Sequence, residues 1–195
     1  MTYREWSKLS FIDPEACLTG MREMLRELIP QLQPHAEFAM KSRPAREMGE
    51  YERCAIFCYG MASASGAKIK FSGTEQCDYD YILSVSHNEV HTFVPLQMKQ
   101  LVPESVNSGT DLQSEIDKLK RKYVVSSDLV VAIHVNRFGL AAIEDLDLSN
   151  LKILELWLFG IINPDIREWQ IIGNLLGPKP NVVTFQLPVE SPRLL

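Results

Sequence analysis

Two short stretches decide the fold of this 195-residue chain: Cys77-Asp78-Tyr79-Asp80-Tyr81-Ile82-Leu83 and Pro95-Leu96-Gln97-Met98-Lys99. Apolar, aromatic and β-branched residues dominate Tyr79–Val85 and Val90–Lys99, and turn-forming residues separate them at His87–Glu89. This composition is typical of two strands joined by a short turn. The sequence therefore predicts a hairpin that carries acidic, amide and basic side chains.

The hairpin is expected to gather these polar side chains on one face. Side chains alternate along a strand, so Gln97 and Lys99 point to the same side. If the turn is centred between residues 88 and 89, Asp80 lies opposite Gln97 and Asp78 lies opposite Lys99. A carboxylate, an amide and an ammonium group that meet on adjacent strands indicate a binding site.

Hydrophobic periodicity predicts the elements on both sides of the hairpin. Asp13-Pro14 is a good helix start, Pro30 ends that helix, and a second helix begins near Pro44. The predicted elements are helices at 14–30 and 44–60, strands at 67–71, 79–85 and 90–99, a helix at 111–123, strands at 129–135 and 153–162, a helix at 163–176 and an edge strand at 182–187. This order predicts a single α/β domain over residues 1–195, with a mixed sheet between helices and a tail at 188–195.

Composition limits the class of protein. Hydrophobic residues make up 46% of the chain, which is enough for one sizeable core. The sequence has no apolar run long enough for a transmembrane helix and no apolar N-terminal signal, so we expect a cytoplasmic protein without a membrane partner. Its four cysteines are too few for a disulfide framework. The net charge of −5 argues weakly against a nucleic-acid partner.

Glu52 adds a second candidate carboxylate. Its neighbours three, four and seven positions away on the predicted helix are Met48, Ala55, Ile56 and Tyr59. Glu52 is therefore expected on the inward face of the helix. A carboxylate on that face needs a basic partner or a metal, because an unpaired buried charge costs several kcal/mol.

The order of these residues and elements resembles the PD-(D/E)xK nuclease superfamily. Glu52 lies on a predicted helix, Asp80 on a strand and Gln97-Met98-Lys99 on the next strand, before a further helix and strand. The Gln-x-Lys form is similar to that of Mrr-like nucleases. The resemblance covers residues 44–136 and implies a restriction endonuclease-like αβββαβ core, with an extra N-terminal helix and C-terminal strand and helix additions.

The resemblance also implies a role for each motif residue. Asp80 and the Met98 carbonyl would ligate Mg²⁺ or Mn²⁺, and Glu52 would hold the metal or its waters. Lys99 would orient and activate the attacking water, and Gln97 would replace the usual second acid. Mg²⁺ prefers such oxygen ligands, and a metal beside a phosphodiester both polarises it and lowers the pKa of a bound water. The implied partner is DNA.

Other interpretations of the same residues remain open. Asp78 is a second candidate for the position of Asp80, and Asn136, at the end of an apolar strand, is a further candidate for the site. The acidic residues and Lys99 also fit a surface ion-pair cluster on a half-exposed hairpin. The basic run Lys118–Lys122 fits either a solvated helix face or a surface that contacts phosphates.

Two functions are therefore compatible with the sequence. The first is a Mg²⁺-dependent nuclease that hydrolyses DNA phosphodiester bonds through a metal-activated water, which the Asp80 and Lys99 pair favours. The second is a catalytically inactive protein of the same fold that binds a partner or forms a homodimer. The acidic charge balance and the neutral Gln97 favour this second function.

Overall fold

The computed structural model describes residues 3–32, 43–74, 78–137 and 143–188, except for the side chains of residues 29–32. The chain divides into two compact units. The first comprises residues 1–73, 83–93 and 187–195, and the second comprises residues 74–82 and 94–186. The prediction of a single domain stays a prediction, and the predicted tail lies almost entirely outside the described residues.

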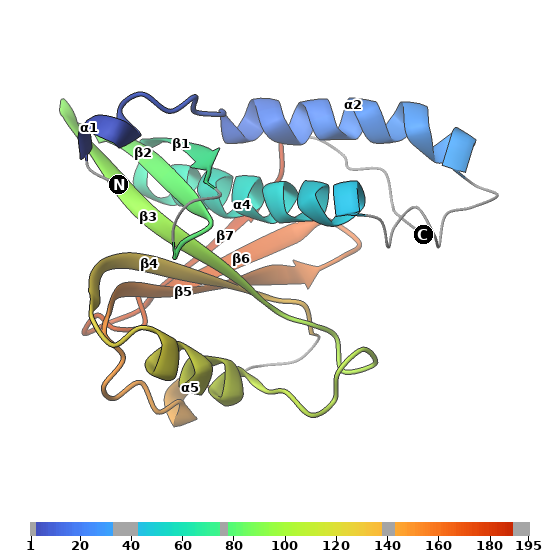
Figure 1. The fold of residues 1–195 in the computed structure, drawn as a ribbon. Coiled ribbons are helices and arrows are strands. Elements are labelled where there is room, and N and C mark those ends of the chain that lie inside the picture. The colour runs from blue at the N-terminus through green and yellow to red at the C-terminus, as the bar shows by residue number, and fades with distance from the viewer. Residues whose placement is uncertain (1–2, 33–42, 75–77, 138–142, 189–195) are drawn as a thin grey trace. The chain divides into compact units, whose positions relative to one another are not determined.

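Figure 1 shows the order of the elements along the chain. The elements are α1 (Tyr3–Trp6), α2 (Pro14–Leu32), α4 (Arg43–Ser65), β1 (Lys68–Gly73), β2 (Tyr81–His87), β3 (Val90–Leu101), α5 (Leu112–Lys122), β4 (Ser126–Val135), a 3₁₀ turn (Ile143–Asp145), β5 (Ile153–Asn163), β6 (Glu168–Gly173) and β7 (Asn181–Gln186). In the part of the chain that the structure describes, no helix is long and apolar enough to cross a bilayer.

The seven strands form one sheet in the order β1-β2-β3-β4-β5-β6-β7. A two-residue turn, Asn88-Glu89, joins β2 to β3, and both residues have the positive φ angles, 47° and 66°, that a tight hairpin turn requires. The β3–β4 and β4–β5 pairs are parallel, whereas β5–β6 and β6–β7 are antiparallel. The predicted α/β class, with N-terminal helices followed by a mixed sheet, is confirmed.

Helix α5 connects the parallel strands β3 and β4 in the second unit. Asp111 caps its first turn, because its carboxylate accepts a hydrogen bond of 2.7 Å from the Ser114 backbone N–H. Leu112, Ile116 and Leu119 are buried, as their spacing predicts, and they join a core cluster with Val131, Ile133 and Leu156 of the sheet. This packing fixes the end of α5, and with it Tyr123, over the face of the sheet that carries Gln97.

The predicted helix at 163–176 is wrong, and its residues form the strand β6 instead. The Asn163 side chain accepts a hydrogen bond of 3.1 Å from the Asp165 N–H, which is the contact of a capped helix start but here stabilises a turn. Arg167 completes the reversal with a φ of 52°. The next residues, Glu168–Gly173, pair with β5 on one side and β7 on the other. The C-terminal addition is therefore three strands, β5, β6 and β7, and the predicted strands at 153–162 and 182–187 are confirmed.

The first unit is built from α2, α4 and β1, which pack against one another. Phe57 of α4 and Phe71 of β1 are almost completely buried. Phe71 also exchanges two backbone hydrogen bonds with Ile12, of 2.8 and 3.0 Å, which tie the segment before α2 to β1. Helix α2 runs to Leu32, so the prediction that Pro30 ends this helix is wrong by two residues.

Candidate functional site

Asp80 lies immediately before β2 and is fixed to β3 by its backbone. Its N–H donates to the Leu96 carbonyl at 3.0 Å, and its own carbonyl accepts from the Thr74 N–H at 3.0 Å. All three residues belong to the second unit. These bonds place the Asp80 side chain beside the motif of β3, which agrees with the predicted hairpin.

Gln97 makes the central contacts of the site. Its side chain is 4% exposed. The Nε2 atom donates one hydrogen bond to Asp80 Oδ2 and another, of 3.1 Å, to the Met98 carbonyl. The Met98 N–H also donates to Asp80 Oδ2, at 2.9 Å. Two acceptor oxygens, one from Asp80 and one from Met98, therefore converge on a single nitrogen atom.

Tyr123, at the C-terminal end of α5, completes the network from the helix side. Its hydroxyl donates to Gln97 Oε1 at 2.7 Å and also lies 3.2 Å from the Asp78 carbonyl oxygen. Both the nitrogen and the oxygen of the Gln97 amide therefore have partners, as a buried polar side chain requires. The sequence indicated that Tyr123 faces inward. Its polar contact was missed, although a tyrosine near a buried amide commonly satisfies that amide.

Lys122 adds positive charge beside this network. Its Nζ lies 4.9 Å from the centre of the Tyr123 ring. A hydrogen bond to the Tyr123 hydroxyl raises the pKa of Lys122, and the nearby carboxylates of Asp78 and Asp80 raise this pKa further. Burial raises the pKa of Tyr123, whereas the charge of Lys122 lowers it. A lysine and two aspartates thus lie close enough to influence one another.

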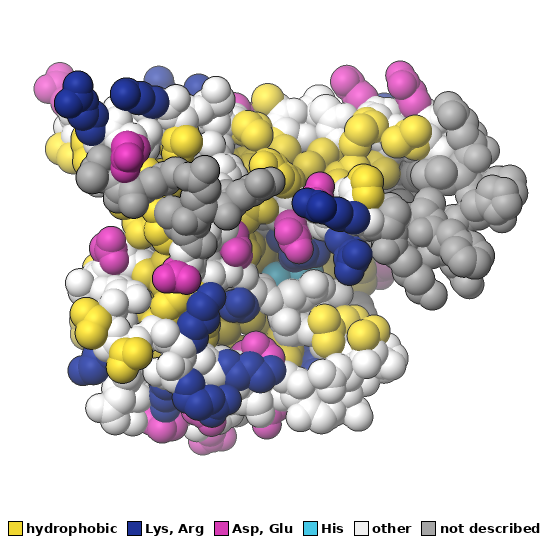
Figure 2. Space-filling model, in the orientation of Figure 1, with side chains coloured by type: hydrophobic (Ala, Val, Ile, Leu, Met, Phe, Trp, Pro, Cys, Tyr) yellow, Lys and Arg dark blue, Asp and Glu magenta, His cyan; other side chains and the backbone are white. Residues whose placement is uncertain are grey.

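The remaining lysines of the basic run are engaged elsewhere. Figure 2 shows Lys and Arg side chains over α5, in the lower part of the view, with acidic side chains among them. Lys118 pairs with Glu115 at 2.6 Å, and Lys120 pairs with Asp147 at 2.7 Å. These pairs are those of a solvated helix face, so Lys122 is the lysine of the run that lies nearest the candidate site.

Lys99 lies two residues beyond Gln97 on the same face of β3. It is half-buried and lies opposite Ile133 of the parallel strand β4. None of the described carboxylates of its own unit lies within ion-pair distance of its ammonium group. Asp78 is exposed and contacts Tyr123 through its backbone carbonyl. Asp78 and Lys99 therefore form no ion pair, and the predicted placement of the two residues opposite each other stays a prediction.

Asn136 lies apart from the Asp80 network. Its N–H donates to the Leu101 carbonyl at 3.0 Å, which extends the pairing of β3 and β4. Leu101 is four residues beyond Gln97, or about 13 Å along the strand. The structure therefore does not place Asn136 beside Asp80 and Gln97.

Glu52 belongs to α4 of the first unit. Burial raises its pKa above the ordinary value, while the neighbouring Arg53 lowers it. Its charge also reaches Cys17 of α2, whose pKa is raised to about 11 by burial first and then by Glu52 and Cys58. Glu52 is half-buried and lies close enough to Cys17 of α2 to influence it, as expected for the inward face of α4. The prediction that it reaches Asp80 stays a prediction.

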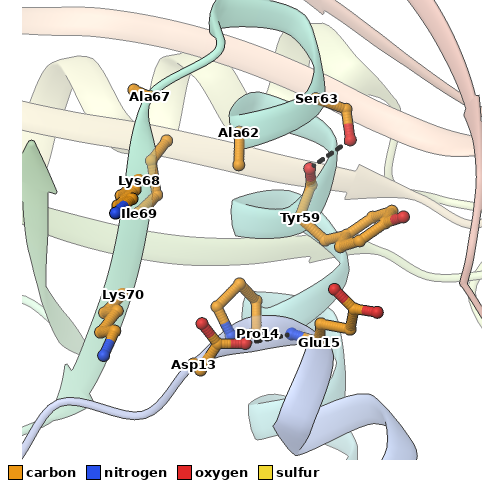
Figure 3. A pocket seen from close by; sticks show the side chains of 10 residues that line it. All are labelled: Asp13, Pro14, Glu15, Tyr59, Ala62, Ser63, Ala67, Lys68, Ile69 and Lys70. Atoms are coloured by element: carbon orange, nitrogen blue, oxygen red, sulfur yellow. Dashed lines mark hydrogen bonds between the residues drawn. The ribbon is translucent and has the colours of Figure 1, made fainter. Parts of the chain in front are cut away.

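A separate hollow of about 440 Å³ lies in the first unit. Figure 3 shows that it is lined by the start of α2, the end of α4 and β1, including Asp13, Tyr59, Lys68 and Lys70. The Asp13 carboxylate accepts hydrogen bonds from the backbone N–H groups of Glu15 and Ala16, so the free N–H groups at the start of α2 already have a partner. Both lysines are exposed. No unsatisfied polar group of these residues indicates a ligand, so the Asp80 network is the stronger candidate.

The donor atoms around Asp80 decide whether a cation fits there. The described residues contain no group of three His, Cys, Asp or Glu side chains that could hold a metal ion. A cation at this place would therefore depend on backbone oxygen as well as carboxylate. Asp80 Oδ2 and the Met98 carbonyl oxygen meet this need, because both already lie within hydrogen-bond distance of one point, the Gln97 nitrogen.

Comparison with known proteins gives no assignment. No protein-family model matches the chain, and no curated protein and no solved structure matches it.

Proposed function

We propose that this protein is a Mg²⁺- or Mn²⁺-dependent nuclease with a restriction endonuclease-like core. The observation that supports it best is the convergence of Asp80 Oδ2 and the Met98 carbonyl on one point, with Lys99 on the same strand as Met98. The elements from α4 to β4 also follow the αβββαβ order of the PD-(D/E)xK superfamily.

In this proposal, Asp80 and the Met98 carbonyl hold the cation. The bound cation would polarise the scissile phosphodiester and lower the pKa of a water molecule. Asp80 is suited to its role because two N–H donors hold its carboxylate in one orientation. The predicted role of Glu52 as a further ligand stays a prediction and carries no part of this proposal.

Two lysines supply positive charge for the phosphate. Lys99 is half-buried without a described carboxylate partner in its unit, so its charge is available to a substrate. Lys122 lies beside the network from the α5 side. Positive groups aimed at the charge that develops in the transition state lower the barrier, by about 3 kcal/mol or more for one well-placed group.

A binding protein of the same fold is the second candidate. It is favoured by the neutral Gln97 amide, which has all its hydrogen-bonding groups satisfied without a cation. The net charge of −5 also favours a partner other than DNA, such as a second copy of the chain.

Plasmid nicking in Mg²⁺ or Mn²⁺ distinguishes the two candidates. We expect the wild type to nick DNA, and Asp80→Ala and Lys99→Ala to lose at least about a hundredfold in rate. Lys179→Ala removes an exposed lysine of the same unit and is expected to keep full activity. Thermal melts of each variant exclude unfolding. Equal nicking by all four proteins would reveal contamination, and a wild type inactive on duplex, branched and single-stranded DNA would support the binding protein.

A further inference from the structure

The Gln97 amide occupies the point on which the two candidate ligand oxygens converge. Its Nε2 donates to Asp80 Oδ2 and to the Met98 carbonyl. The same amide is buried, so water does not compete for these contacts. An N–H donor therefore satisfies the lone pairs that a cation would use.

The orientation of this amide follows from its neighbours. The Asp80 carboxylate and the Met98 carbonyl only accept hydrogen bonds, so the amide must present nitrogen to them. On its other side, the Tyr123 hydroxyl donates to Oε1 at 2.7 Å. Turning the amide by 180° without a cation would bring Oε1 against two acceptor oxygens. Gln97 is therefore held in the orientation in which it cannot offer oxygen to a metal.

We propose that Gln97 is a built-in competitor of the cation, and not the substitute for an acidic ligand that the sequence motif implies. The inference rests on the proposed cation site at Asp80. A cation bound to these two oxygens at their point of convergence would need the place that Nε2 occupies, so the two compete for it. Binding of the cation therefore requires the Gln97 amide to leave its hydrogen bonds first, which lowers the affinity for the metal.

If Gln97 competes with the cation, removing its amide should raise the affinity for the metal, and this change can be measured. Replacing Gln97 by a side chain of similar size without N–H donors removes the competing bonds and leaves Asp80 and Met98 in place. Loss of one net hydrogen bond from the cation-free state corresponds to about tenfold in binding. If Gln97 were instead a ligand through Oε1, the same replacement would weaken binding.

Calorimetric titration with MnCl₂ tests this on the full chain. The variants are Gln97→Met and Gln97→Leu, and the matched control is Gln100→Met, which changes a half-buried glutamine of the same strand on the opposite face. We expect both Gln97 variants to bind Mn²⁺ about tenfold more tightly than the wild type, and Gln100→Met to bind as the wild type does. Thermal melts show which variants are folded, and either Gln97 variant alone suffices.

The outcomes separate this inference from the proposed function. Equal or weaker Mn²⁺ binding by a folded Gln97 variant, beside a wild type that binds, would overturn the competition and leave the cation site intact. Binding by the variants alone would support the competition most strongly. Gln97→Glu serves as a probe of the site itself, because it adds a carboxylate next to Asp80. No binding by any protein, Gln97→Glu included, at millimolar Mn²⁺ would overturn the cation site and the proposed nuclease with it.

Discussion

Replacing Tyr123 by phenylalanine tests the polar network directly. The substitution keeps the ring, which packs in the core beneath α5, and removes only the hydroxyl. That hydroxyl donates to Gln97 Oε1 at 2.7 Å, and both side chains are 4% exposed. The variant therefore leaves a buried carbonyl oxygen without a donor, in a place that water does not reach.

The expected loss of stability follows from this burial. An unsatisfied buried acceptor costs about 1–3 kcal/mol. The second contact of the hydroxyl, 3.2 Å from the Asp78 carbonyl, adds little because Asp78 is exposed and its carbonyl can bind water. We expect Tyr123→Phe to lower the free energy of unfolding by about 2 kcal/mol at neutral pH.

Urea denaturation at pH 7 measures this difference. Tyr3→Phe is the matched control, because Tyr3 is 53% exposed and its hydroxyl donates to the His91 carbonyl at 3.2 Å. Loss of an exposed hydrogen bond changes stability by less than about 0.5 kcal/mol. A Tyr123→Phe variant that loses no more stability than Tyr3→Phe would refute the buried hydrogen bond to Gln97.

The difference in stability between the wild type and Tyr123→Phe is also expected to depend on pH. Burial raises the pKa of Tyr123 above its ordinary value of 10.0. Below pH 10 the hydroxyl is neutral in both the folded and the unfolded chain. Above that pH the unfolded chain ionises first, so Tyr123 contributes a stability that is lost as the pH rises through its folded pKa. The difference between wild type and Tyr123→Phe is therefore expected to shrink above pH 10.

Two further predictions concern the first unit. Burial raises the pKa of Glu52 above 4.5, so folding disfavours its charge at neutral pH. Glu52→Gln is therefore expected to raise the midpoint of thermal unfolding at pH 7 and to have no such effect below pH 4.5. A variant that melts at the same temperature as the wild type at both pH values would contradict this. The pKa of Cys17 is raised to about 11 from 9.0, which lowers the fraction of reactive thiolate. In a Cys77→Ser background, a thiol reagent at pH 8 should therefore modify Cys17 about a hundredfold more slowly in the folded than in the unfolded protein. Equal rates of modification of Cys17 in the two states would exclude a shielded thiol.

Much of the fold could be predicted because local pattern and tertiary packing agree. The spacing of Leu112, Ile116, Leu119 and Tyr123 predicts the buried face of α5, and all four side chains are buried. The helix predicted at 163–176 was wrong because Asn163-Pro164 offers the same side-chain contact to a turn as to a helix start. Residues 168–173 form a strand because they pair with β5 and β7, and the local sequence does not show that these partners are present.

The site shows the same division between local and long-range information. The pairing of Asp80 with Gln97 follows from the hairpin register, since a tight turn fixes which residues face each other. The contact of Tyr123 with Gln97 joins residues 26 positions apart through a helix, and no short-range pattern reports it. The orientation of the Gln97 amide depends on that contact, so the sequence motif alone could not distinguish a ligand from a competitor.

The contacts that hold Asp80 in place also limit what Asp80 can do. Two N–H donors, from Gln97 and Met98, hold its carboxylate oxygen, and the bond from Gln97 is the one that a cation must replace. The Met98 N–H belongs to the backbone and stays, so Asp80 keeps its orientation when the Gln97 bond is lost. An acid in place of Gln97 would repel Asp80 in the absence of a cation and would stabilise the site only when a cation is bound. The neutral amide of Gln97 has the opposite effect, because its hydrogen bonds stabilise the cation-free protein. The site is therefore occupied only when the metal concentration is high enough to displace the amide.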